Sequence, residues 1–146
     1  MAILRKISNF GASVEDLKII YVAYVRSILE QYCTVWHCSL TEENSKDIER
    51  VQKSVCKLIR AENYKSYENA LKTLNLESLF DRREILCLDF AKKCLRNEKM
   101  KILFKENPKI HEMETRNKEK YEITHARTNR FKKSSIIYMQ RLLNEQ

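Results

Sequence analysis

The scarcity of chain breakers is the feature that most limits what this sequence can fold into. Its 146 residues contain one glycine, Gly11, and one proline, Pro108. Because tight turns and bulges rely on these two residue types, a chain with so few of them favours long helices. The same scarcity excludes several kinds of site. Phosphate-binding loops, dinucleotide-binding fingerprints and the nucleophile elbow all need glycines at fixed positions.

Hydrophobic residues recur at helical spacing over most of the chain. Ser13 with Asp16 has the spacing of a capping box, and Thr41 precedes acidic residues that favour a helix start. The sequence therefore predicts an all-α fold, an irregular bundle of about five to six helices. The expected helices cover residues 1–10, 13–32 and 42–61, a short helix after Ser66, residues 77–97 with a further turn at 100–104, and a final helix after Ser134 or Ser135.

The expected helix over residues 42–61 carries a stripe that we expect to be buried, formed by Ile48, Val51, Val55, Leu58 and Ile59. Two other helices carry apolar residues, here also called stripes, that recur at helical spacing. In the helix that ends near Tyr32 the stripe consists of Leu17, Ile20, Tyr21, Tyr24, Val25, Ile28 and Leu29. In the helix over 77–97 it consists of Leu79, Ile85, Leu88, Ala91 and Leu95.

Residues 105–130 lack sustained periodicity, contain Pro108 and are dense in charge, so we expect them to be irregular. This change in pattern predicts two parts. A helical domain covers residues 1–104, and a basic C-terminal extension with a final helix covers residues 105–146.

The positive charge is concentrated in the last third of the chain. The net charge is +8; residues 1–91 hold 13 basic and 13 acidic side chains, whereas residues 92–146 hold 15 basic and 7 acidic ones. A basic surface of this kind attracts polyanions through Coulomb forces and counterion release. A solvated tail that aids solubility is the alternative interpretation.

The five cysteines favour reduced thiols rather than disulfides or zinc ligands. Cys33 and Cys38 flank His37, but structural zinc needs four ligands, and the next cysteine, Cys56, lies within a helical pattern without a neighbouring ligand. Cys87 and Cys94 share one helix face, which indicates small buried side chains. We expect no metal ion, no cofactor and no catalytic residues.

The best candidate for binding lies between Arg116 and Lys133, where cations alternate with aromatic rings. Cations with interspersed aromatic side chains suit contacts with phosphates and stacking of bases. Glutamates dilute the first half, so the undiluted part begins at Arg127. The nucleic-acid-binding residues predicted here are Arg116, Lys118, Lys120, Arg127, Arg130, Phe131, Lys132 and Lys133.

Ordered segments along nearly the whole chain point to a family. In the first half they are Phe10-Gly11, Ser13-Val14-Glu15-Asp16-Leu17, Tyr24-Val25-Arg26-Ser27-Ile28-Leu29-Glu30, Val35-Trp36-His37 and Asp47-Ile48-Glu49-Arg50-Val51-Gln52-Lys53. In the second half they are Tyr67-Glu68-Asn69-Ala70-Leu71, Asp81-Arg82-Arg83-Glu84, Phe90-Ala91-Lys92-Lys93, Arg127-Thr128-Asn129-Arg130-Phe131 and Tyr138-Met139-Gln140-Arg141-Leu142-Leu143-Asn144. In order and spacing they resemble the region that follows the polymerase palm in reverse transcriptases of jockey-like non-LTR retrotransposons.

This resemblance implies that residues 1 to about 60 correspond to the thumb and the helices beyond it, and the remainder to the C-terminal extension. The family's fingers and palm are absent, and the chain has no Asp-Asp pair like the one whose carboxylates hold the two catalytic metal ions. Polymerase activity is therefore not expected. Arg60-Ala61 stands where the family often has a helix-ending glycine, and Ile137 where a proline is common. The abrupt start suggests a truncated or decayed element copy, or an incomplete gene prediction.

The function expected from these observations is a non-catalytic fragment of a reverse transcriptase that contributes contacts with the nucleic-acid backbone. Its partners would be RNA or an RNA–DNA hybrid and the rest of the reverse transcriptase. The alternative is a helical protein-interaction module that docks through Leu79, Phe80 and Leu88 or through the stripe of residues 14–32. We expect an intracellular protein, nuclear or cytoplasmic, that is not inserted in a membrane, because no apolar run is long enough to span one.

Overall fold

The computed structural model describes residues 2–107 and 120–146, and the chain divides into two compact units. Unit 1 comprises residues 1–32 and 40–83; unit 2 comprises residues 33–39 and 84–146. This division does not coincide with the boundary expected after residue 104, because residues 33–39 and 84–104 belong to the unit that contains the C-terminal segment. The reason lies in the packing of residues 87–94, whose buried side chains join a core with those of the final helix.

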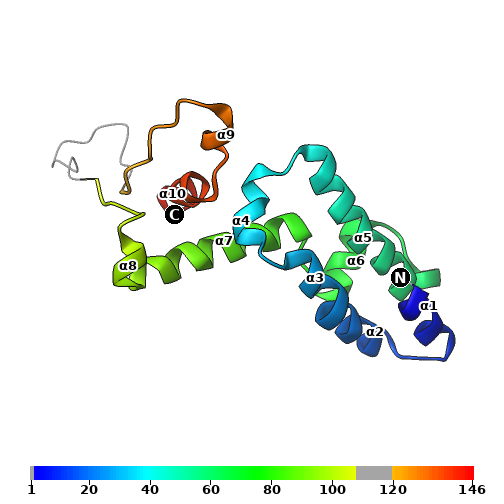
Figure 1. Ribbon diagram of the computed structural model, residues 1–146. Helices are drawn as coiled ribbons and strands as arrows, with labels where there is room; N and C mark the ends of the chain where they lie inside the picture. Colours follow the sequence, from blue (N-terminus) through cyan, green and yellow to red (C-terminus); the bar gives the residue numbers. More distant parts are fainter. Residues whose placement is uncertain (1, 108–119) are drawn as a thin grey trace. The chain divides into compact units, whose positions relative to one another are not determined.

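The fold is all-α, as predicted, and the described residues contain no strand (Figure 1). Unit 1 contains α1 (Ala2–Asn9), α2 (Val14–Ile20), the π-helical turn η1 (Tyr21–Arg26), α3 (Ser27–Glu30), α5 (Glu42–Arg60), the 3₁₀ turn η3 (Ala61–Asn63), α6 (Tyr67–Leu74) and the start of α7 (Leu79–Arg96). Unit 2 contains α4 (Cys33–Trp36), the 3₁₀ turn η2 (His37–Ser39), the rest of α7, α8 (Glu98–Lys101), α9 (Asn129–Lys132) and α10 (Ser135–Asn144). The number of helices is slightly above expectation because several of them are single turns.

The helix starts in unit 1 lie where the capping residues predict them. The Ser13 hydroxyl accepts from Asp16 N at 3.2 Å and the Asp16 carboxylate accepts from Ser13 N at 3.3 Å, which is a complete capping box. Thr41 caps α5 and Ser66 caps α6, each hydroxyl accepting a backbone N–H three residues later. Such caps each contribute about 1 kcal/mol to helix stability.

The helical run from Val14 to Glu30 is interrupted by η1, and this changes which side chains are buried. A π-helical turn holds one extra residue, so the buried face moves on by one position. Val25 and Leu29 are half-buried, whereas Tyr24 and Ile28 are 71% and 70% exposed. The residues that recur at helical spacing in the sequence therefore do not share one buried face, because the run is not a regular α-helix throughout.

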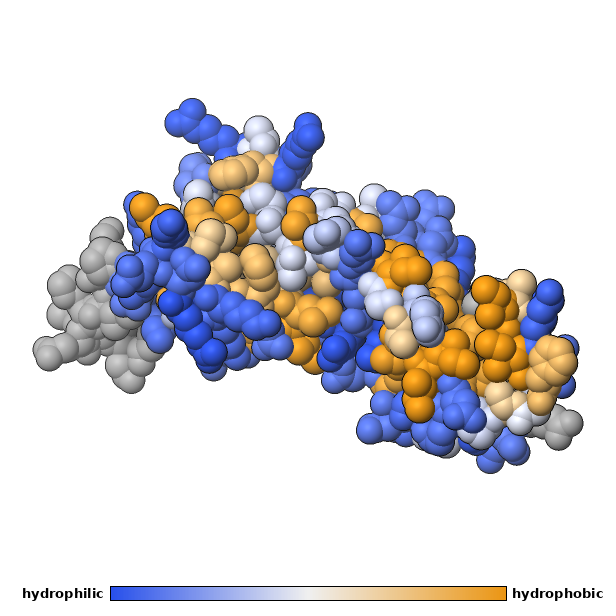
Figure 2. Space-filling view, turned by 60° about the horizontal axis from the view of Figure 1, so that its bottom comes forward, coloured by the Kyte–Doolittle hydropathy of each residue, from blue (hydrophilic) through white to orange (hydrophobic). Residues whose placement is uncertain are grey.

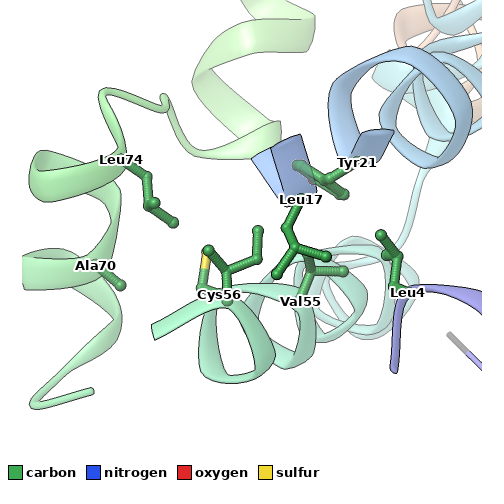
Figure 3. Packing of buried hydrophobic residues seen from close by; sticks show 8 residues of the cluster. Leu4, Leu17, Tyr21, Val55, Cys56, Ala70 and Leu74 are labelled. Carbon is green, nitrogen blue, oxygen red and sulfur yellow. The ribbon is translucent and has the colours of Figure 1, made fainter. Parts of the chain in front are cut away.

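The core of unit 1 is built from helices far apart in the sequence (Figure 3). Its buried side chains are Leu4, Leu17, Tyr21, Val55, Cys56, Ile59, Ala70 and Leu74. They come from α1, α2, η1, α5 and α6, and Figure 3 shows those of Leu17, Val55 and Cys56 converging. The central helix of this unit is therefore α5, whose stripe was predicted from its spacing.

A buried glutamine links several of these elements. Gln52 in α5 is fully buried; its Oε1 accepts from the Tyr21 hydroxyl, and its Nε2 donates to the Tyr67 hydroxyl at 2.9 Å and to the Glu77 carbonyl at 2.8 Å. The Tyr67 hydroxyl in turn donates to Glu49, which also accepts from Leu79 N at 3.2 Å. The Gln52 amide and the Tyr21 and Tyr67 hydroxyls all have partners, so burying them is compatible with a stable core, while Glu49 Oε2 is buried without a hydrogen-bond partner among the described residues.

The core of unit 2 joins the second half of α7 to α10. Its buried side chains are Cys87, Ala91, Cys94, Phe104, Tyr121, Met139 and Leu143. The shared face of Cys87 and Cys94 is thus confirmed as buried, and all five cysteines are free thiols. Ile85, predicted in the same stripe, is 40% exposed. None of the described helices is at once long enough and apolar enough to cross a bilayer.

Candidate nucleic-acid interface

Residues 120–126 are attached to the rest of unit 2 at two places. Asn107 N donates to Lys120 O and Glu122 N donates to Lys105 O, both at 2.9 Å, which forms an isolated antiparallel bridge between Glu106 and Tyr121. On the other side, α10 holds the same segment through side-chain amides. Asn144 pairs with the backbone of Tyr121.

Gln140, one turn before Asn144, makes the second attachment. Its Oε1 accepts from Thr124 N at 2.9 Å, and its Nε2 donates to Thr124 Oγ1 at 3.1 Å and to the Leu103 carbonyl at 2.9 Å. Gln140 is buried, so these bonds are shielded from water. Residues 120–126 therefore have a defined backbone path without being part of a helix or a sheet.

The short helix α9 carries three of the eight predicted binding residues. The Thr128 hydroxyl caps α9 by accepting from Phe131 N at 3.2 Å, and Ser134 then begins α10. The sequence predicted irregular structure up to residue 130, so α9 was missed; four residues are too few to show a periodic pattern. The cap at Thr128 was the available signal.

The predicted residues within the described part of the chain lie on the surface. Lys120, Arg127, Arg130, Lys132 and Lys133 are all exposed. Phe131 is 46% exposed, and Lys120 Nζ lies 5.5 Å from the centre of the Tyr121 ring.

Two further predicted residues, Arg116 and Lys118, lie outside the described residues. Of the rest, α9 and the residue after it bring together Arg130, Phe131, Lys132 and Lys133, whereas Lys120 belongs to the bridged segment. The candidate site therefore centres on α9.

Phe131 lies at the edge of a groove of about 390 Å³. The groove is mostly apolar, and its hydrophobic lining comes from Ile102, Leu103, Phe131, Ile136 and Ile137. Of the two isoleucines at the start of α10, Ile137 is buried, while Ile136 is 37% exposed; both line this groove.

Polar residues also line the groove. Lys105, Glu122 and His125 line it together with Thr124. Ser134 also lines it, and the Ser134 hydroxyl oxygen is buried without a hydrogen-bond partner among the described residues. A buried hydroxyl normally has a partner, so this one departs from the usual pattern.

The cations of unit 2 differ from those of unit 1 in their surroundings. In residues 84–107 and 120–146 every lysine and arginine is exposed, and none is paired with a described carboxylate. They are Lys92, Lys93, Arg96, Lys99, Lys101, Lys105, Lys120, Arg127, Arg130, Lys132, Lys133 and Arg141. The ion pairs of the described residues all lie in unit 1, for example Arg26 and Arg82 with Glu30, both at 3.5 Å.

Other candidate chemistry has a structural explanation. His37 is buried, and its ring meets that of Tyr138 edge-on with 5.6 Å between centroids. Tyr138 donates to Glu84 at 2.9 Å, and burial together with this bond raises the pKa of its hydroxyl. Burial raises the pKa of the Cys38 thiol, which disfavours a metal-binding thiolate. Within residues 2–107 and 120–146, no group of three or more histidine, cysteine or acidic residues is placed to hold a metal ion.

Sequence analysis did not assign a role in the site to Gln140 or Asn144, and it considered Ser134 only as the residue before the final helix. A polar amide recurring four residues apart on an otherwise apolar helix face was the signal for the first two. The buried Ser134 hydroxyl could only be found in the tertiary structure.

Comparisons with known proteins provide no relative for this chain: no family profile, no characterised protein and no solved structure matches it.

Proposed function

We propose that this chain is a non-catalytic C-terminal fragment, thumb and post-palm region, of a non-LTR retrotransposon reverse transcriptase, and that unit 2 contacts nucleic-acid backbone. The family assignment is supported by the ordered segments that resemble jockey-like reverse transcriptases. The partners would be RNA or an RNA–DNA hybrid, together with the fingers and palm of the parent enzyme. The protein would act inside the cell, in the nucleus or the cytoplasm.

The observation that carries the binding part of this proposal is the state of the cations in unit 2. Exposed cations that have no nearby carboxylate keep their full attraction for phosphate, since no internal ion pair has to be broken. Unit 1 also carries cations, but several of them are held by carboxylates. Backbone contacts of this type give affinity without reading the base sequence.

The experiment is a titration of the full chain with single-stranded RNA and with an RNA–DNA hybrid at two salt concentrations, followed by fluorescence anisotropy. Phosphate contacts make the logarithm of the affinity fall linearly with the logarithm of salt, by about 0.7 per contact on a single strand. Replacing Arg127, Arg130, Lys132 and Lys133 by glutamine removes up to four contacts. The salt slope should therefore become shallower by about 3.

A variant of equal net charge provides the control. Lys6, Lys53, Lys65 and Lys72 are exposed cations of unit 1 without a described ion pair, and changing all four to glutamine lowers the net charge by the same amount. The proposal expects this control to bind nearly as tightly as the wild type. An equal loss of affinity for nucleic acid in both variants would mean that overall charge alone attracts the ligand. The absence of binding by a folded wild-type chain would refute the proposal.

A second function, docking onto a protein partner, is favoured by one observation in unit 1. Ile19, Tyr24, Ile28 and Tyr32 are 63–73% exposed, and Figure 2 shows hydrophobic side chains gathered on one face of this unit. Large exposed apolar patches mark interaction surfaces. The other docking residues considered fit less well: Leu79 is fully buried and Leu88 packs against the core of unit 2.

Salt separates the two functions, because apolar docking is not weakened by salt in the way that phosphate contacts are. The test is co-purification of the chain with the fingers and palm of a jockey-like reverse transcriptase. If docking is correct, capture persists in high salt and is lost when Ile19 and Ile28 are changed to serine. Capture that disappears with added salt, or that survives both substitutions, would count against it.

A further inference from the structure

A second hollow lies beside the groove on the other side of Thr124 and His125. Both residues line both depressions. The second hollow has a volume of about 350 Å³ and is lined in addition by the cations Lys132 and Arg141. The apolar groove, which has Phe131 at its edge, and the cationic hollow are therefore adjacent. A short stretch of backbone separates them.

That stretch of backbone is held in place. The Gln140 side chain bonds both the N–H and the hydroxyl of Thr124, as described above, and this fixes the wall between the two hollows. A wall held by a buried side chain keeps its shape, and a preformed site loses less entropy when it binds a ligand.

The two hollows differ in chemistry as the two parts of a nucleotide do. A nucleobase has a flat apolar face and polar edges; Phe131 offers a half-exposed ring for the face, and the exposed polar residues Thr124 and His125 that line the groove suit an edge. A phosphate carries negative charge, and Lys132 and Arg141 are exposed cations without a described carboxylate partner. The volume of the groove lies within the range of about 300–1,000 Å³ that is typical of small-molecule sites.

We propose that this pair of hollows binds one nucleotide of a single strand, with an unpaired base in the groove against Phe131 and its phosphate beside Lys132 and Arg141. Bases of a duplex are stacked and paired and do not enter such a groove, so the site selects single-stranded nucleic acid. This inference rests on the proposed function, and it adds a preference for single strands over duplexes. The charge on the second hollow also suits an acidic peptide, so the test must distinguish binding of a nucleotide from binding of such a peptide.

The test uses the full chain and a short single-stranded RNA that carries one 2-aminopurine, a fluorescent base that is quenched when it stacks. The comparison ligand is an RNA–DNA hybrid of the same sequence. In Phe131→Leu the groove stays apolar but loses its ring. Affinity for the single strand should then fall about five- to hundred-fold, the range for loss of one stacked base, while affinity for the hybrid stays the same.

Two further variants make the outcome specific. Phe131→Tyr keeps the ring and should retain both quenching and affinity. Phe90→Leu changes another aromatic residue of unit 2 with nearly the same exposure, 41% against 46%, and should bind RNA as the wild type does. Circular dichroism of each variant confirms that the helices are intact.

The phosphate part is tested separately. Changing Lys132 and Arg141 to glutamine should reduce the salt slope for single-stranded RNA by about 1.4, because two contacts are lost. The same change at Lys53 and Lys72 in unit 1 removes equal charge from residues that line neither hollow and should leave quenching of the base unaltered.

The results distinguish this inference from the proposed function. If the wild type binds RNA with a steep salt dependence but Phe131→Leu behaves like Phe90→Leu, or if the hybrid binds as tightly as the single strand, the nucleotide site is wrong and the backbone contacts stand. If neither nucleic acid binds, both fail. Displacement of the bound RNA by a Glu- and Tyr-containing peptide at equal concentration would assign the hollows to an acidic peptide and overturn the inference.

Discussion

The side-chain amide of Asn144 pairs with the backbone of Tyr121 in both directions. Its Oδ1 accepts from Tyr121 N at 2.8 Å, and its Nδ2 donates to Tyr121 O at 3.0 Å. The Asn144 side chain thereby makes the two hydrogen bonds that a neighbouring strand would make. It satisfies the N–H and C=O of Tyr121, a residue that belongs to no helix or sheet.

Asn144→Ala should destabilise unit 2 by about 1–3 kcal/mol, because it leaves two backbone groups of a buried residue without partners. Asn144→Asp keeps the Oδ1 acceptor and should therefore lose less stability. Urea unfolding measures both, and hydrogen exchange of the Tyr121 amide should become faster in Asn144→Ala. The neighbouring amide variant Gln146→Ala, which is exposed, is the control. Equal stability of Asn144→Ala and this control would contradict the pairing.

The shift of the buried face at η1 can be tested with two alanine substitutions three residues apart. Val25 packs against the core of unit 1, whereas Ile28 is 70% exposed. Val25→Ala should therefore cost about 1 kcal/mol. Ile28→Ala should change stability by less than about 0.5 kcal/mol. The opposite order in thermal unfolding would show that the run follows a regular α-helical period after all.

Ala61 ends α5 with a φ angle of 33° and a ψ angle of −108°, a backbone conformation that favours glycine. Ala61→Gly should stabilise the chain by about 1 kcal/mol, because it relieves this strain. Ala23→Gly, within the helical run of unit 1, should destabilise it by about the same amount. Denaturant midpoints of the two variants should move in opposite directions; a loss of stability in both would mean that Ala61 is unstrained.

Stability should fall in alkaline solution because buried acids of unit 1 resist ionisation. Burial, with a smaller effect of Glu49, raises the pKa of Cys56 from 9.0 to about 11. The folded state therefore keeps a proton that the unfolded state releases, so stability is fully present below pH 9.0 and is lost progressively towards about pH 11. Burial also raises the pKa values of Tyr21 and Tyr67, which adds to the loss in the same direction.

The variant that checks this pH dependence is Cys56→Ala. It loses packing at every pH, but its stability should fall less steeply between pH 9.0 and about pH 11 than that of the wild type. Urea unfolding at a series of pH values in this window gives both slopes. Identical slopes would exclude Cys56 as a source of the dependence.

Sequence patterns predicted the helices of this chain well where local chemistry governs them. Ser13, Thr41 and Ser66 each cap a helix as expected, because a cap involves only residues three positions apart. The buried stripe of α5 was also predictable, since nineteen residues of regular helix show their period clearly. Of the predicted binding residues, the cations of α9 are exposed, as charge alone suggests.

Other features could not be predicted because distant contacts or an irregular helical turn decide them. The exposure of Tyr24 and Ile28 follows from η1, and nothing in the local sequence distinguishes a π-helical turn from an α-helical one. The grouping of residues 33–39 with the C-terminal segment likewise depends on packing in unit 2, not on a change of composition.

The sequence by itself determined the all-α class, the main helix starts and the surplus of positive charge after residue 91, because each follows from residue type and short-range spacing. Only the tertiary structure decided which apolar side chains are buried, how Gln140 and Asn144 hold residues 121–124, and that Phe131 and Ser134 share one groove. These features depend on groups far apart in the chain whose meeting is fixed by packing of the whole unit, and no local pattern records such contacts.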